Sequence, residues 1–254
     1  MEKIIINLCN SWSDWIEVCK NIKSDKIVIK YENFSENENF DEYKLIIPLS
    51  ISSIINTLDN CEHEKSKLLC PNKEILKLCD NKIEFSKFMT ENYTNNIPKM
   101  VNDINDYPYL AKHKYGIGGQ NIFYIQSEND YINYKIDDDY LLQKYVKTNN
   151  YIVGQYVCKN GKIIFKSFYK TDICDDFTII KGKLNKYHKI IFENDQILIE
   201  IFEKLNYTGF ACVDFTFIDN NVVIFEINPR VGGTFMNDKS DFNQFIDIIL
   251  NNNI

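Results

Sequence analysis

The chain has 254 residues and a formal net charge of −7 at pH 7, with 44% hydrophobic and 26% charged residues. This length and composition are typical of a folded chain with one large or two modest domains, and they exclude disordered and collagen-like chains. The excess of acidic over basic residues, without a cluster of basic residues, argues against nucleic acid as a partner. No stretch approaches the roughly 20 consecutive apolar residues of a membrane helix, so no membrane segment is expected.

The cysteines and the first residues bear on the cellular compartment. None of the eight cysteines forms a C-x-x-C pair, so the spacing of a zinc knuckle is absent. Residues 1–6 lack the long apolar stretch and the small-residue cleavage site of a signal peptide. The sequence therefore predicts reduced thiols and a cytoplasmic location.

Short apolar strands alternate with helical segments in the first 80 residues. The expected strands are 3–8, 26–31, 45–49 and 67–70, and the expected helices are 13–22 and 50–58. Such alternation predicts a small parallel sheet. Helical spacing continues over 73–90 with a break at Asp80-Asn81, where we place the boundary between a domain of residues 1–80 and one of residues 81–254.

The second part of the chain reads as mixed helix and strand. Strands are expected to end near 110–112 and to cover 121–125 and 141–146, and helices are expected over 191–205 and 241–250. Two hairpins are predicted, one joining 151–158 to 162–170 and one joining 211–218 to 222–227. The first turns at Asn160-Gly161, the strongest turn signal in the chain. The fold class is therefore α+β.

The second hairpin carries oxygen ligands suited to a metal. Strand alternation places Glu226 and Asn228 on one face, and a turn near Asn220 sets Asp214 roughly opposite Glu226. Two carboxylates and an amide oxygen suit Mg²⁺, which also takes phosphate and water ligands. The alternative is that these carboxylates are merely solvated, but their Val, Phe and Ile neighbours suggest burial, which requires partners.

A lysine followed by a glycine-rich turn forms a second motif. Lys112 ends a predicted strand, and glycines at 116, 118 and 119 precede the next strand. Backbone N–H groups of such a turn can face a polyphosphate, and the lysine adds a positive charge. Glycine-rich hairpins without ligands are common, so the motif is weak alone. It is neither a Walker loop nor a dinucleotide fingerprint.

Together, in this order and separation, the two motifs resemble the ATP-grasp superfamily. The match covers roughly 81–250 and is most specific in the run Glu226-Ile-Asn-Pro-Arg-Val-Gly-Gly233. It is nearest to carboxylate–amine ligases, such as L-amino-acid ligases, and to the ATP-binding domains of carbamoyl-phosphate synthases. The resemblance implies an α+β fold in which two lobes hold ATP, preceded by an abbreviated Rossmann-like lobe over residues 1–80.

The resemblance also implies roles for individual residues. Lys82 and Lys112 match phosphate-binding lysines, the glycines match a lid loop, and residues 142–146 match the strand whose main chain reads adenine. The implied nucleotide-binding residues are Lys82, Lys112, Gly116, Gly118, Gly119, Gln143, Lys144, Tyr145, Val146 and Asn150.

The implied metal ligands are Asp214, Glu226 and Asn228, with Mg²⁺ as the ion and Mn²⁺ as an alternative. The implied catalytic residues are Lys112 and Arg230, the latter steadying an acyl phosphate or the oxyanion that follows it.

Three positions depart from the family pattern. Asn150 stands where an acidic residue usually holds the ribose, and Asn121 stands where the lid often has a further glycine. Cys212 replaces an arginine that some members carry two residues before the first metal ligand, which argues against a D-alanine–D-alanine ligase.

The implied activity is ATP-dependent ligation of a small-molecule carboxylate to an amine through an acyl phosphate. Two alternatives stay open: a nucleotide-binding module without ligation activity, and an enzyme that forms carboxyphosphate from bicarbonate. A homodimer is compatible with the resemblance. We expect the acceptor pocket to be built by residues 232–235 and by a loop over 171–183, with Phe235 and Phe177 as apolar walls.

Overall fold

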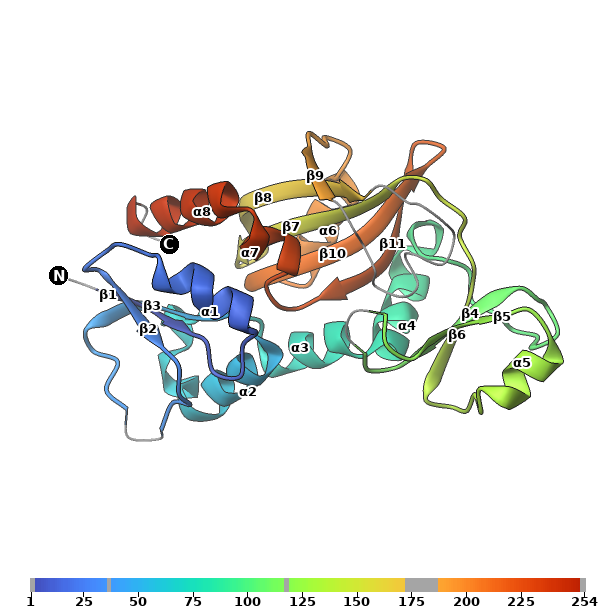
Figure 1. Cartoon of the computed structure of the whole chain (residues 1–254), viewed down its shortest axis with the longest axis horizontal. Helices are drawn as coiled ribbons and strands as arrows, with labels where there is room; N and C mark the ends of the chain where they lie inside the picture. Colours follow the sequence, from blue (N-terminus) through green and yellow to red (C-terminus); the bar gives the residue numbers. More distant parts are fainter. Residues whose placement is uncertain (1–2, 36–37, 117–118, 172–186, 252–254) are drawn as a thin grey trace.

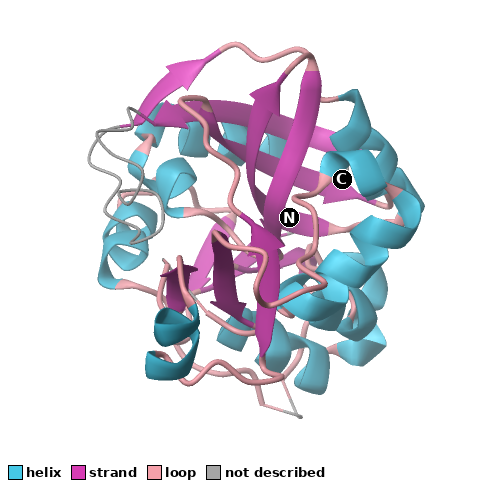
Figure 2. Ribbon diagram, turned by 90° about the vertical axis from the view of Figure 1, so that its right-hand side faces the viewer, coloured by secondary structure: helices cyan, strands magenta, loops and turns pink. Residues whose placement is uncertain are grey.

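The computed structural model describes residues 3–35, 38–116, 119–171 and 187–251. Three sheets form its framework (Figure 1). The strands lie in the middle of the molecule, with helices to either side (Figure 2). Within the described ranges, no helix combines the length and the apolar character that crossing a bilayer requires.

The N-terminal sheet is parallel, with the strand order β2-β1-β3. Its strands are β1 (Lys3–Asn7), β2 (Ile27–Lys30) and β3 (Tyr43–Pro48), and its helices are α1 (Ser13–Lys20) and α2 (Ile51–Asn60). The predicted small parallel sheet is confirmed. The predicted strand over 67–70 is wrong, because a 3₁₀ helix (Glu62–Lys67) precedes a single bridge between Ile46 and Leu68. The Rossmann-like description of this lobe stays a prediction.

Two helices lead out of this sheet toward the rest of the molecule. They are α3 (Lys73–Asp80) and α4 (Lys82–Asn92). The expected break between them is confirmed, because the Asn81 side chain accepts hydrogen bonds from the N–H groups of Ile83 and Glu84 and so begins a new helix. A short 3₁₀ helix (Thr94–Asn96) follows α4. The predicted domain boundary at this break stays a prediction.

A three-stranded antiparallel sheet lies at the end of the molecule opposite the N-terminal sheet (Figure 1). It has the order β5-β4-β6, with β4 (Tyr109–His113), β5 (Ile122–Ile125) and β6 (Tyr140–Lys144), and carries helix α5 (Glu128–Asn133). The three strands were expected. The short helix was not, because its six residues are too few to give a helical apolar period.

A five-stranded antiparallel sheet, with the order β11-β10-β7-β8-β9, lies between the other two. Its strands are β7 (Tyr151–Lys159), β8 (Lys162–Thr171), β9 (Tyr187–Ile190), β10 (Gly209–Ile218) and β11 (Asn221–Asn228). Both predicted hairpins are present, and their turn residues have positive φ, as two-residue hairpin turns require. Helix α6 (Gln196–Lys204) begins five residues after the expected position, because residues 191–195 form an irregular segment between β9 and the N-cap residue Asp195.

The last helices return to the N-terminal sheet. Helices α7 (Gly233–Asn237) and α8 (Lys239–Asn251) bury Phe235, Phe242 and Phe245 in one hydrophobic cluster with Ile4 and Ile47 of the parallel sheet. The two ends of the described chain therefore share a core. The remaining face of the five-stranded sheet packs against α6 in a separate cluster.

Candidate functional site

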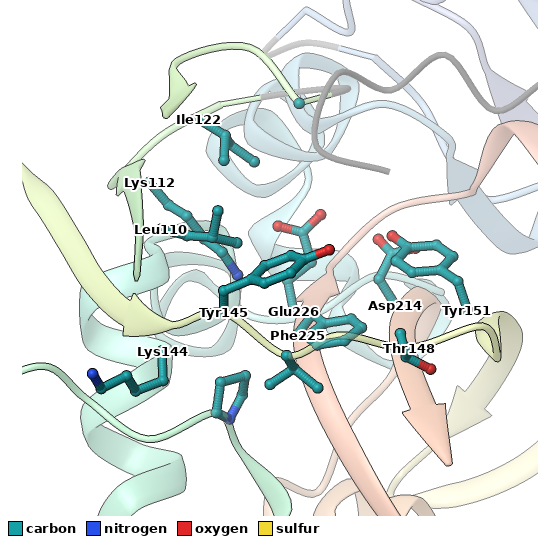
Figure 3. A pocket seen from close by; sticks show the side chains of 13 residues that line it. Leu110, Lys112, Ile122, Lys144, Tyr145, Thr148, Tyr151, Asp214, Phe225 and Glu226 are labelled. Carbon is teal, nitrogen blue, oxygen red and sulfur yellow. The ribbon is translucent and has the colours of Figure 1, made fainter. Parts of the chain in front are cut away.

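A cavity lies between the two antiparallel sheets, and Figure 3 shows its lining side chains. The smaller sheet contributes Leu110, Lys112 and Ile122, and the larger sheet contributes Tyr151, Asp214, Phe225 and Glu226. Lys144 at the end of β6 and the segment that joins the two sheets, with Tyr145, Val146 and Thr148, complete the wall, and Pro98 and Gly119 also contribute. The cavity therefore brings together the lysine motif and the carboxylate motif, which lie about a hundred residues apart in the sequence.

The three predicted metal ligands converge in the structure. Asp214 pairs directly with Glu226 across the β10–β11 hairpin, and Cys212 pairs with Asn228. The Asn228 Nδ2 group donates to Asp214 Oδ2 at 3.2 Å and to Glu226 Oε1 at 3.0 Å. The expected juxtaposition of these side chains is thus confirmed, while their role as metal ligands stays a prediction.

The two carboxyl groups have opposite pKa shifts. Burial, together with the charge of Glu226, raises the pKa of Asp214 well above its usual value. Burial alone would raise the pKa of Glu226 as well, but Lys82, Asn228 and Lys112 overcome that effect and lower it to about 2. Ionising Asp214 beside the charged Glu226 therefore carries an electrostatic cost that a divalent cation would remove.

This donor set fits Mg²⁺. The described residues contain no group of three or more His, Cys, Asp and Glu side chains that could hold a metal ion. Mg²⁺ needs only one or two protein carboxylates when substrate phosphates supply further oxygens. Asn228 would have to rotate its amide so that Oδ1 replaces Nδ2 toward the ion.

Lys82 connects the first turn of α4 to the carboxylates. Its Nζ lies 3.1 Å from Glu226 Oε2 and donates to the backbone oxygen of Gly116 at 3.1 Å. The side chain is buried, and the Asn81 cap fixes the start of the helix that carries it. Lys82 therefore lies at the site, although it does not line the cavity itself.

Lys112 is buried in the cavity wall and is held by an amide. Its Nζ donates to Gln143 Oε1 at 3.1 Å, and Gln143 Nε2 donates to Ser86 Oγ at 3.2 Å. Burial lowers the pKa of Lys112 to about 8, against the opposing effect of Glu226. Gln143 was expected among the nucleotide-binding residues, but its side chain is absent from the cavity lining and instead orients Lys112.

The strand expected to read adenine borders the cavity. Lys144, Tyr145 and Val146 line it. The Lys144 side chain points away from the cavity and donates to the backbone oxygen of Asp106 at 2.6 Å, so only its main chain faces the cavity (Figure 3). Asn150 does not line the cavity; its Oδ1 accepts from Lys170 Nζ at 2.7 Å. Its role at the ribose stays a prediction.

The glycine-rich turn is described in part. Gly119 lines the cavity at φ +76°, a conformation that favours glycine, and Gly116 accepts the hydrogen bond from Lys82. Gly118 lies outside the described residues, as do Phe177 and most of the expected 171–183 loop.

Arg230 follows β11 but does not line the cavity. Its guanidinium lies over the Trp12 ring at 5.6 Å, and Nη1 donates to the Val231 oxygen at 2.9 Å. The expectation that Phe235 forms a pocket wall is wrong, because this side chain is fully buried in the core shared with the N-terminal sheet. Its acceptor-pocket neighbour Thr234 is buried too and accepts from Gln155 Nε2 at 2.7 Å.

The sequence did not reveal the apolar wall formed by Phe225 and Tyr151, whose rings stack at 5.8 Å. The β10–β11 register shifts after Asp214, so that Phe215 pairs with Ile224 and Phe225 is an extra residue. This bulge lets Phe225 and Glu226 line the same cavity, although strict alternation would place them on opposite faces. Nothing in the local sequence marks this bulge.

The comparisons with known proteins agree with this geometry. The family model described as an ATP-grasp domain matches residues 79–234. An uncharacterised protein of Methanocaldococcus jannaschii is 27% identical over 258 residues, covering 99% of this chain and 59% of that protein. A tyramine–L-glutamate ligase of the same organism is 24% identical over 223 residues, covering 86% of this chain and 65% of the relative.

The chain thus spans less than two thirds of the length of each of these relatives.

The crystal structure of a D-alanine–D-alanine ligase from Bacillus anthracis superposes with a TM-score of 0.66 at 16% identity, covering 100% of this chain and 97% of that one. This likeness concerns the fold, whereas the family model covers more than half of the sequence. The chain therefore belongs to the ATP-grasp family.

Proposed function

We propose that this protein is an ATP-dependent ligase that activates a small-molecule carboxylate as an acyl phosphate and joins it to an amine. The proposal depends above all on one observation: Lys112, Asp214 and Glu226 line a single cavity together with the main chain of 144–146. This arrangement offers an apolar wall for a base. It also offers a lysine for the phosphates of ATP and two carboxylates for the metal ion that accompanies them.

The chain's own residues bind and orient ATP. The rings of Tyr151 and Phe225 pack against the adenine, and the main chain of 144–146 hydrogen-bonds its edge. Lys112 and Lys82 neutralise phosphate oxygens. Asp214, Glu226 and Asn228 would hold Mg²⁺, which would neutralise further negative charge on the phosphates. Closure of the two sheets around the triphosphate excludes water, which would otherwise hydrolyse the activated carboxylate.

The chemistry consists of two transfers. A carboxylate oxygen of the donor attacks the γ-phosphorus, and the bond to the β-phosphate oxygen breaks to release ADP. The amine nitrogen then attacks the acyl carbon, inorganic phosphate leaves, and the amine loses a proton. Arg230 donates hydrogen bonds to the negative charge that develops on the acyl group, which is the interaction that lowers the barrier.

The similarity to a tyramine–L-glutamate ligase supports an amine and a carboxylate as substrates, since its name specifies one of each. Cys212 argues against one alternative substrate, D-alanine. Its thiol is buried, and Gln155 Nε2 donates to Sγ at 3.2 Å, so this position provides no cation for a D-alanine carboxylate.

The test is hydroxylamine trapping. The protein is incubated with Mg-ATP, hydroxylamine and a panel of amino acids and dicarboxylates, and hydroxamate and ADP are quantified. Because hydroxylamine replaces the amine, only the carboxylate has to be correct. Equal amounts of hydroxamate and ADP support the proposal, and Glu226→Gln should abolish both.

The alternatives give different results in the same assay. Thermal stabilisation by Mg-ATP without hydroxamate from any carboxylate would indicate a nucleotide-binding module. Phosphate release that depends on bicarbonate, with no hydroxamate, would indicate formation of carboxyphosphate.

A further inference from the structure

The guanidinium of Arg230 contacts an aromatic ring and a backbone oxygen. Its Cζ lies 5.6 Å from the centroid of the Trp12 ring, and only one hydrogen bond is recorded for its side chain, from Nη1 to the Val231 oxygen. Among the described residues, Arg230 forms no ion pair with a carboxylate. Four of its five N–H donors therefore have no protein acceptor there. The charge of Arg230 acts on Asp214 and Asp80, but no carboxylate is paired with it, so the Trp12 face and the Val231 oxygen are the contacts that fix its direction.

Trp12 is itself held by the N-terminal lobe. The centroid of its ring lies 5.1 Å from that of Trp15, a residue of α1 that is buried in the hydrophobic core and only 2% exposed. Trp12 is the N-cap residue of this helix, and the preceding Asn10 has a φ of +53°, an uncommon conformation for a residue other than glycine. Trp12 nevertheless remains 49% exposed. The Trp12 indole is thus held by Trp15 on one side, while about half of its surface is exposed to solvent.

A second link joins the same two regions. The Val231 N–H donates to the Leu49 oxygen at 3.3 Å, directly after β3. The segment at Arg230 is therefore attached to the N-terminal lobe twice, once after β3 and once through the loop after β1. Both attachments lie beyond the carboxyl ends of parallel strands, the edge at which open α/β sheets present functional loops.

We infer that Trp12 is a positioning residue for Arg230, which makes the N-terminal lobe part of the reaction machinery. This inference rests on the proposed function, in which Arg230 stabilises the acyl group. The cation–π contact holds the guanidinium in place before substrate arrives, and its free N–H donors remain available to the developing charge. Loss of the ring leaves Arg230 present but less restrained, which reduces the rate and leaves nucleotide affinity unchanged.

The test is a double-mutant cycle with an aromatic control. Trp12→Leu should lower kcat for hydroxamate formation about fivefold, which is the loss in rate expected when a half-exposed cation–π contact is removed. The KM for ATP should stay unchanged. Trp12→Phe keeps an aromatic face and should retain most of the rate. In an Arg230→Ala background, Trp12→Leu should have no further effect, because Trp12 acts only through the arginine. Tyr31→Leu, which removes an aromatic side chain of similar exposure at 47%, should change nothing.

A measurement without substrate separates this inference from the proposed function. The protein is labelled with 5-fluorotryptophan, which gives two ¹⁹F resonances that Trp12→Phe assigns. Arg230→Ala should shift the Trp12 resonance and leave that of Trp15 nearly unchanged. If wild-type protein forms no hydroxamate, the proposed function fails while this shift still reports the contact. An unmoved Trp12 resonance, equal losses in Trp12→Leu and Trp12→Phe, or an undiminished effect of Trp12→Leu in the Arg230→Ala background would overturn the inference.

Discussion

Lys82 Nζ lies 3.1 Å from Glu226 Oε2, so the first turn of α4 and the end of β11 meet at one ion pair. Both partners are shielded from solvent, with side-chain exposures of 10% and 28%. Glu226 is therefore held as a carboxylate where it faces the cavity, while Asp214 beside it has a raised pKa. Lys82 thus sets the charge of the site before any ligand binds.

We expect Lys82→Met to weaken Mg-ATP binding by ~10-fold or more, because a phosphate contact and the partner of a partly buried carboxylate are both lost. Lys87→Met is the matched control on the same helix, since Lys87 is 62% exposed and pairs with Glu84 at the surface. Isothermal titration calorimetry with Mg-ATP measures both. Equal affinities for the two variants would contradict a role of Lys82 at the phosphates.

Asp214→Asn should separate stability from function. Removing a carboxyl group whose ionisation is opposed by burial and by Glu226 should stabilise the ligand-free protein by ~1 kcal/mol, which raises Tm by about 2–4 °C for a chain of this size. The same change should lower Mg²⁺-dependent ADP release by ~10²-fold or more. Asp247→Asn, at an exposed position of α8, should affect neither Tm nor turnover. A lower Tm for Asp214→Asn would show that the carboxylate is stabilising.

Lys112 should take up a proton when ATP binds. Its pKa of about 8 leaves a substantial neutral fraction at pH 8.5, and a bound triphosphate raises the pKa by favouring the charged form. The observed binding enthalpy at pH 8.5 should then depend on the ionisation enthalpy of the buffer, and this dependence should be much weaker at pH 6.5. Lys112→Arg stays charged throughout and should remove it. Buffer-independent enthalpies for the wild type at pH 8.5 would rule out this protonation.

Gln143→Leu should impair ATP binding without any direct contact to the cavity. Its amide joins Lys112 to Ser86, and replacing it leaves both buried groups without this partner, at an expected cost of about 1–3 kcal/mol in the free energy of unfolding. Lys112 then loses its orientation, so the KM for ATP should rise. Gln126→Leu changes an exposed glutamine and serves as the control. Urea denaturation and steady-state kinetics give the two quantities.

Gly232→Ala and Gly233→Ala should differ sharply. A Cβ on Gly232 would lie 2.1 Å from Gln155 Nε2 and 2.7 Å from Cys212 Sγ, whereas one on Gly233 would meet nothing within 4 Å. We expect Gly232→Ala to destabilise the protein by about 1–3 kcal/mol through overpacking. Gly233→Ala should be nearly neutral. Urea denaturation of both variants tests this, and similar midpoints would contradict the packing of Gln155 against Gly232.

The sequence predicts the elements and motifs that depend on local chemistry. The turn at Asp219-Asn220, with positive φ at both residues, fixes the hairpin register, and the register in turn brings Asp214 opposite Glu226. Asn81 signals the break between α3 and α4 in the same way. These features follow from residues that are close in the sequence.

Features that depend on distant contacts were not predictable. The role of Gln143 becomes visible only when β6 lies beside β4 and Ser86 of α4 lies beneath it. The contact between Trp12 and Arg230 joins residues more than two hundred positions apart, and Trp12 alone reads as ordinary packing. The bulge that turns Phe225 into the cavity arises from sheet geometry and has no signal of its own.

The core shared by the first and last described elements also constrains how the protein is made. Ile4 and Ile47 of the N-terminal sheet are covered by Phe242 and Phe245 of α8. During translation, this apolar face therefore stays exposed until α8 has left the ribosome, since α8 is synthesised long after β1 and β3. The parallel sheet thus leaves the ribosome before the antiparallel sheets but is buried only after α8 has followed them. Nascent chains that stop before α8 should consequently depend on chaperones that bind exposed apolar strands.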